Sequence, residues 1–194
     1  MENQYPAASE YWVDAAAVDK YPNRYGDVFA TPEVDECVDR KGRRWAHVLV
    51  LHPSCELGGK AAADTEVLIA RVNAVTAIGA TQRAAVRMGW REVDGEAVHA
   101  YTNTFWLPPI PGQDDDADWY ADFRRLQRVP LGALLDAGRE ATMTHDARLF
   151  LIRREIYFKY RWQVSHADVQ AAEASRINGD SNFVGPRPDW ATGS

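Results

Sequence analysis

The segment from Trp45 to Leu51 most constrains how this chain can fold. It is a short run of apolar, β-branched and aromatic side chains between the basic turn Arg40-Lys41-Gly42 and Pro53. Apolar runs of this length between turn residues are typical of buried β-strands. An isolated strand cannot bury both of its faces, so the segment has to pair with other strands to form a core.

Further strands are expected on both sides of this segment. Gly26–Ala30 precedes it, and Glu66–Val75 follows it. In the second segment the odd-numbered residues 67–73 alternate with the apolar residues 68, 70, 72 and 74, as on the two faces of a strand. Asp94-Gly95 lies between two short runs and predicts a hairpin. Two more strands are expected at Thr104–Leu107 and Trp119–Val129. The pattern therefore predicts a mainly β fold with peripheral helices, an α+β protein.

The helices are expected at the edges of this sheet. Residues near Trp12–Val18 predict a short helix, Thr76–Gly89 has apolar residues near helical spacing, and Leu131–Leu135 predicts a helical turn. These segments are short, so they predict a covering layer rather than a helical core.

A longer helix is predicted over Thr144–Trp162. Thr144 can cap its first turn, and Asp146 suits the positive end of the helix dipole. Residues 155–162 also alternate as a strand would. Helix is favoured for 144–154, and both conformations stay open for 155–162.

Length and composition predict one domain with two extensions. The 194 residues divide into an N-terminal extension (1–25), a barrel-like domain (26–164) and a flexible tail (165–194). No apolar run approaches the roughly 20 residues that cross a bilayer, and the first residues lack the features of a secretory signal. The two cysteines fit a reducing compartment. A cytoplasmic protein without membrane attachment is therefore expected.

Charge is unevenly distributed along the chain. The net charge is −6, but residues 121–162 carry nine Lys and Arg against five Asp and Glu, so this segment is +4 and the remainder −10. A basic segment in an acidic chain indicates an anionic partner. A solvated helix surface with ion pairs explains the same pattern.

The turn after the Trp45–Leu51 strand concentrates reactive side chains. His52, Ser54, Cys55 and Glu56 follow one another within five positions. Cys55 could act as a nucleophile if His52 or His47 accepted its proton. The alternative is a small buried cysteine beneath a turn, since free cysteine is often buried.

No metal or cofactor is predicted. His52 and Cys55 have a spacing that zinc ligands can show, but no second pair completes a four-ligand site.

The order of elements resembles the PemK/MazF family of small SH3-like barrels. The matching patches are Gly26-Asp27-Val28-Phe29, the segment Arg44–Pro53, the strand Val67–Val75, and two later phrases, Ala121–Val129 and Met143–Leu151. Together they cover about residues 26–155 in patches. The resemblance implies an SH3-like, PemK-like barrel with a long C-terminal helix.

This resemblance also implies a toxin-type ribonuclease, or a degenerate relative, with RNA or an antitoxin-like protein as partner and a homodimer as the assembly. The family's usual active-site phrases are absent from the loop 35–44 and from the strand containing Arg71. An RNA-cleaving site needs a cation for the phosphate and a base for the 2′-hydroxyl. The candidate catalytic residues are Arg44, His52 and Cys55.

The candidate substrate-binding residues are Arg40, Arg43 and Trp45. Basic side chains hold phosphates, and a tryptophan beside them can stack on a base. Core packing explains the tryptophans equally well. Two other functions stay open: a Cys55-dependent enzyme acting on a small molecule, and a non-catalytic protein-interaction module built on 144–162.

Overall fold

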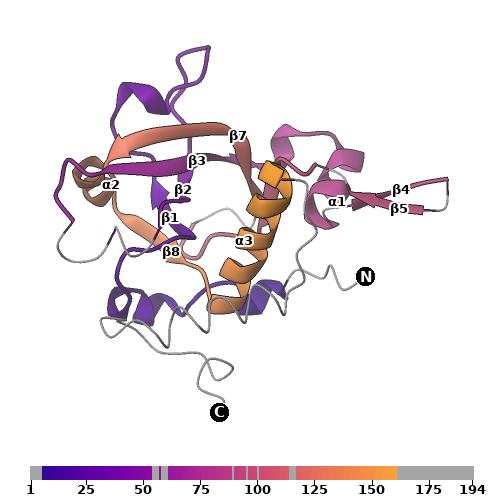
Figure 1. Cartoon of the computed structure of the whole chain (residues 1–194), viewed down its shortest axis with the longest axis horizontal. Helices are drawn as coiled ribbons and strands as arrows, with labels where there is room; N and C mark the ends of the chain where they lie inside the picture. The colour runs from indigo at the N-terminus through magenta and orange to yellow at the C-terminus, as the bar shows by residue number, and fades with distance from the viewer. Residues whose placement is uncertain are drawn as a thin grey trace.

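The computed structural model describes residues 6–53, 57, 61–88, 90–94, 96–99, 101–113 and 117–160. Its centre is a six-stranded, wholly antiparallel sheet in the order β6-β7-β3-β2-β1-β8. The sheet curls into a half-barrel with helices around it (Figure 1). The predicted α+β class, mainly β with peripheral helices, is confirmed. The strands are β1 (Asp27–Ala30), β2 (His47–Val50), β3 (Glu66–Ala74), β6 (Thr104–Leu107), β7 (Trp119–Pro130) and β8 (Arg139–Thr142).

The two faces of the sheet bury different clusters because neighbouring residues on a strand point to opposite sides. Leu49 and Val72 belong to one cluster, which also receives Leu151 from the C-terminal helix. Val48 and Ile69 belong to the other. Both faces are therefore covered, which explains why β2 is a continuous apolar run rather than an alternating one.

The helices around the sheet are α1 (Ala80–Met88), α2 (Leu131–Ala137) and α3 (His145–Tyr160), together with the 3₁₀ turns η1 (Ala8–Glu10), η2 (Ala15–Lys20), η3 (Asp35–Cys37) and η5 (Val75–Ala77). The three α-helices and the 3₁₀ turn η2 form where the sequence predicts helices, whereas η1 and η3 lie outside the predicted segments. A separate hairpin of β4 (Trp90–Val93) and β5 (Glu96–His99) extends from the body of the molecule beyond α1 (Figure 1). Asp94 in its turn has φ of 53°.

The C-terminal helix begins at the predicted position. It also includes residues 155–160, for which both helix and strand had been open. The Thr144 hydroxyl oxygen accepts the backbone N–H of Ala147 at 3.3 Å, which is the expected N-terminal cap. α3 then runs through Tyr160, so residues 155–160 are helical. Residues 161–164 of the predicted domain and the predicted tail 165–194 lie outside the described residues.

None of the helices in the described part of the chain is both long enough and apolar enough to cross a membrane.

Candidate nucleic-acid interface

The basic turn before β2 is organised by one carboxylate, that of Asp39. Its Oδ1 accepts the backbone N–H groups of Lys41 (2.8 Å) and Arg43 (3.0 Å), and its Oδ2 accepts Nε of Arg43 at 2.9 Å. The backbone hydrogen bond from Arg43, with help from its side chain and from Lys41, lowers the pKa of Asp39 to about 2. Gly42 takes a φ of 73°, which a glycine adopts without strain. The carboxylate of Asp39 is therefore ionised at neutral pH, and its hydrogen bonds hold the turn in one conformation.

Arg71 connects this turn to the sheet. It lies on β3 with its side chain 23% exposed, and its Nη2 is 3.9 Å from Oδ2 of Asp39. Its guanidinium lies over the ring of Trp45, 5.9 Å from the centroid. Within the described residues, the buried Nε of Arg71 has no hydrogen-bond partner. Asp39 therefore sits between Arg43 and Arg71, which are far apart in sequence.

A bulge in β7 adds a further arginine on the other side of Arg71. The register pairs Arg71 with Asp122 and then shifts, so the β7 residues after Asp122 bulge out of the ladder. Both carboxylate oxygens of Asp122 accept the guanidinium of Arg124 at 3.0 Å. Although burial acts in the opposite direction, these bonds lower the pKa of Asp122. The side chain of Arg124 remains 65% exposed.

Tyr120 on β7 lies near Asp122, Arg71 and Arg124. Burial and the nearby Asp122 raise the pKa of Tyr120, while Arg71 and Arg124 act on it in the opposite direction. We call this region the basic surface and define it by five cationic residues, Arg40, Lys41, Arg43, Arg71 and Arg124.

The predicted substrate-binding residues divide between this surface and the core. Arg40 and Arg43 are exposed on the turn, as is Arg44, whose Nη1 donates to the carbonyl of Pro32 at 2.9 Å. Trp45 is only 6% exposed and belongs to a hydrophobic cluster. Its ring supports the guanidinium of Arg71, and a buried ring cannot stack on a base.

The structure separates two of the three predicted catalytic residues, Arg44 and His52. Arg44 precedes β2 and His52 follows it, so they lie towards opposite ends of that strand. His52 is 7% exposed, and its Nδ1 accepts the backbone N–H of Leu68 at 3.4 Å. Cys55 and its neighbours Ser54 and Glu56 lie outside the described residues.

Sequence reasoning did not select five members of the arrangement as site residues: Asp39, Lys41, Arg71, Asp122 and Arg124. Asp39 carried a usable signal, because Asp-Arg-Lys-Gly is a typical turn sequence in which the aspartate accepts backbone N–H groups. Arg71 carried a signal as well, because it is a charged residue between buried apolar residues of its strand. The β7 bulge has no comparable local signature.

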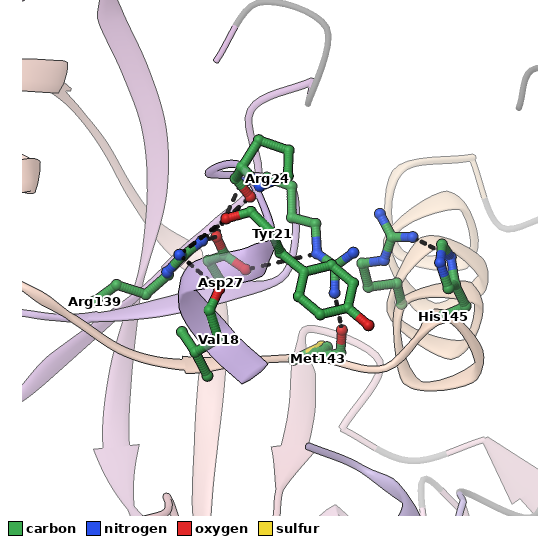
Figure 2. A network of polar contacts seen from close by, with 9 residues as sticks. Val18, Tyr21, Arg24, Asp27, Arg139, Met143 and His145 are labelled. Atoms are coloured by element: carbon green, nitrogen blue, oxygen red, sulfur yellow. Dashed lines mark hydrogen bonds and ion pairs between the residues drawn. The ribbon is translucent and has the colours of Figure 1, made fainter. Parts of the chain in front are cut away.

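A second group of charged side chains lies inside the fold (Figure 2). Asp27 is fully buried, and its Oδ2 accepts the backbone N–H of Arg24 at 2.9 Å and Nη1 of Arg139 at 3.1 Å. Arg139 also donates to the carbonyls of Val18 and Tyr21, and Arg24 donates to that of Met143. These bonds tie the N-terminal segment to β1, β8 and the start of α3. Because the arginines bind main-chain carbonyls, this network holds the fold together.

Neither metal chemistry nor a reactive thiol is seen in the described part of the chain. It contains no cluster of three or more His, Cys, Asp or Glu side chains able to hold a metal ion. Cys37 is fully buried. Burial, together with Glu36, raises the pKa of the Cys37 thiol to about 11, so it is a thiol at neutral pH.

No protein-family model matches this sequence, and no curated protein is significantly similar to it.

Proposed function

We propose that this protein binds single-stranded RNA through the basic surface, as a PemK/MazF-like barrel that has kept RNA binding. One observation carries the proposal: Asp39 contacts Arg43 and approaches Arg71, which fixes a basic turn against the sheet beside Arg124. Cations from three separate segments thereby face one region. The six-stranded curled sheet with peripheral helices is compatible with this ancestry.

Phosphates are the groups this surface would hold. Arginine presents a planar fork of N–H donors that matches phosphate oxygens. The guanidinium of Arg71 is supported from below by Trp45, and its side chain is 23% exposed. Asp39 and Asp122 neutralise part of the charge, but Arg40 and Lys41 remain exposed at the turn. The expected affinity is modest and depends strongly on salt.

Binding rather than cleavage is proposed because the groups needed for cleavage are separated. Arg44 and His52 lie towards opposite ends of β2. The buried ring of Trp45 offers no platform for base stacking. Recognition would therefore depend on the backbone of the RNA and show little sequence preference.

The test is the salt dependence of binding to a labelled single-stranded oligoribonucleotide, measured by fluorescence anisotropy. Contacts with about four phosphates give a slope of log K against log salt near −3. Arg71→Ala and Arg43→Ala each remove one contact and flatten the slope by about 0.7. Arg71→Lys keeps the charge but not the fork, and it should recover part of the affinity.

Lys20→Ala is the matched control. Lys20 is exposed on η2, which packs against β8 at the other edge of the sheet from β6 and β7. It removes the same unit charge away from the basic surface. If Lys20→Ala weakens binding as much as Arg71→Ala does, or if binding does not respond to salt, the proposed function is wrong.

A further inference from the structure

An aromatic side chain, that of Tyr120, lies on the same face of the sheet as Arg71. Tyr120 on β7 pairs with Asn73 on β3, and Asn73 is two residues after Arg71, so the three side chains point to one face. The neighbours of Tyr120 on its strand, Trp119 and Ala121, are buried in the apolar cluster of the opposite face. Tyr120 itself packs against that cluster but is only partly buried. The basic surface therefore continues along β7 to an aromatic ring.

The face that carries Tyr120 is covered at one end of β3 and open at the other. Val67 and Ile69 are fully buried in the cluster on this face. Arg71 and Asn73 follow them on the same side of the strand, and both are partly exposed. Solvent, or a ligand, therefore reaches the sheet at the end where Tyr120 lies.

Arginines lie on both sides of Tyr120 across the sheet, because β7 is placed between β3 and β6. Arg71 on β3 is near enough to influence the pKa of Tyr120. On the other side, Trp106 of β6 pairs with Tyr120, and the guanidinium of Arg87 from α1 lies over the ring of Trp106, 5.3 Å from its centroid. The side chain of Arg87 is 63% exposed, and its Nη1 is 4.0 Å from Oδ2 of Asp118, which is beyond hydrogen-bond distance. Arg87 therefore keeps donors for a ligand.

This order of groups, a cation, a ring and a second cation, matches a single strand of RNA, in which phosphates flank each unpaired base. The strands that present the two arginines are separated by two strand spacings, or roughly 10 Å. An aromatic ring can stack on any base, because every base has a π-face. A duplex keeps its bases paired inside the helix, where a ring on a sheet cannot reach them.

We propose that Tyr120 stacks on an unpaired base of the bound RNA while Arg71 and Arg87 hold the phosphates on the two sides of that base. This role rests on the proposed function and extends the basic surface across β7 to α1. It also supplies the stacking platform that the buried Trp45 cannot offer. Sequence preference stays small, because stacking accepts every base, but single strands are selected over duplexes.

The test compares two labelled octamers by fluorescence anisotropy with the full chain at one salt concentration. One is octauridylate, and the other is the same ribose-phosphate chain without bases. They carry the same phosphates, so binding through charge alone does not distinguish them. Stacking on one base predicts that the wild-type protein binds octauridylate about fivefold more tightly than the chain without bases.

Three variants assign this preference to the ring of Tyr120. Tyr120→Phe keeps the ring and should keep the preference, whereas Tyr120→Leu removes the ring and should bind both octamers equally. Trp119→Phe is the matched control, because Trp119 is the adjacent aromatic residue of β7 and belongs to the opposite face. It should keep the preference. Thermal unfolding checks that each variant is folded, and the comparison of the two octamers with wild-type protein needs no variant.

Arg87→Ala tests the second cation. It should weaken the binding of both octamers alike and flatten the slope of log K against log salt by about 0.7. Arg83→Ala is its control on the same helix. Arg83 is also exposed, but its Nε donates to the carbonyl of Ile78 at 2.9 Å, so its removal should leave the slope unchanged.

The possible failures separate this role from RNA binding itself. If the wild-type protein binds both octamers equally but still responds to salt, Tyr120 does not stack on a base, and the proposed function stands. Tyr120→Leu with an undiminished preference for octauridylate leads to the same conclusion. If Arg87→Ala keeps the wild-type slope, the RNA does not reach α1. If octauridylate shows no salt-dependent binding at all, the proposed function is wrong and the role of Tyr120 is wrong with it.

Discussion

Removing the buried carboxylate of Asp27 should destabilise the fold more than any exposed charge substitution. Asp27 is fully buried between Arg24 and Arg139, and burial together with Arg148 already lowers the pKa of Arg24 to about 9. In Asp27→Ala the two guanidinium groups would stay inside the protein without this counter-charge. An uncompensated buried charge is among the most destabilising changes known.

The magnitude follows from the bonds that would be lost. Oδ2 of Asp27 accepts two hydrogen bonds, from the backbone of Arg24 at 2.9 Å and from Arg139 at 3.1 Å. Hydrogen bonds to charged groups contribute about 1.5–3 kcal/mol each. Breaking a buried ion pair costs about 3–5 kcal/mol. We therefore expect Asp27→Ala to lower the free energy of unfolding by about 4 kcal/mol. Asp27→Asn keeps an acceptor of the same shape and should cost about half as much.

The assay is urea denaturation followed by circular dichroism, with Asp136→Asn as the control. Asp136 is exposed near the end of α2, so its loss should change stability by less than about 0.5 kcal/mol. The Asp27→Ala/Arg139→Ala double variant should be more stable than the sum of the single effects predicts, because it removes both partners. If Asp27→Ala is as stable as the control variant, the network does not hold the N-terminal segment as argued.

The pH dependence of this effect has a definite sign. Burial raises the pKa of Asp27 above its ordinary value of 3.8, with Arg139 and Arg24 opposing the shift. The folded state therefore binds a proton more readily than the unfolded state, and stability rises as pH falls through the folded pKa towards 3.8. Asp27→Asn cannot gain this proton. The stability difference between wild type and Asp27→Asn should therefore widen as pH decreases, and a difference that narrows would contradict the assigned shift.

Two other predictions concern single positions. Native protein treated with iodoacetamide near neutral pH should leave Cys37 unmodified until it is unfolded, as read by mass spectrometry, since the thiol is buried with a pKa of about 11. Any native-state label would then report Cys55, and its complete absence would remove the Cys55-dependent enzyme from consideration. Gly26→Ala should cost about 1–3 kcal/mol in urea denaturation, because φ is 86° and a Cβ would lie 2.9 Å from Cγ of Arg148. A neutral effect would mean that Arg148 moves aside freely.

The predicted strands were found where local pattern alone determines them. β2 and β3 are apolar runs that end at turn residues, and such runs form strands in most surroundings. β8 was not predicted, because Arg-Glu-Ala-Thr has no apolar pattern. It is a strand because it pairs with β1 and because Arg139 and Glu140 find partners there, Asp27 and His47. Those partners are distant in sequence and cannot be seen from it.

The ambiguity over residues 155–162 has a related cause. Their alternation of apolar and polar side chains matches a strand, yet the described part is helical. Every residue from Ile152 to Phe158 is partly buried in α3, so this stretch has no wholly exposed face to produce a helical period. The capping signal at Thr144 was the better guide, because a cap depends on a few adjacent residues rather than on the surroundings.

The start of β2 is another place where the local sequence pattern does not determine which way the side chains point. Trp45 and His47 are two residues apart, and alternation in a continuous strand would place them on one face. The chain instead bends at Ala46, so Trp45 joins the cluster beneath Arg71 while His47 turns to Glu140 on the opposite face. The turn that presents Arg43 and the strand that presents His47 thus share one end of the sheet but not one surface. Trp119→Phe, which changes a ring that packs on His47 and not on Arg71, should therefore leave RNA binding unchanged, whereas Arg71→Ala should weaken it. Weaker RNA binding by Trp119→Phe would mean that the RNA site spans the end of the sheet and includes both faces.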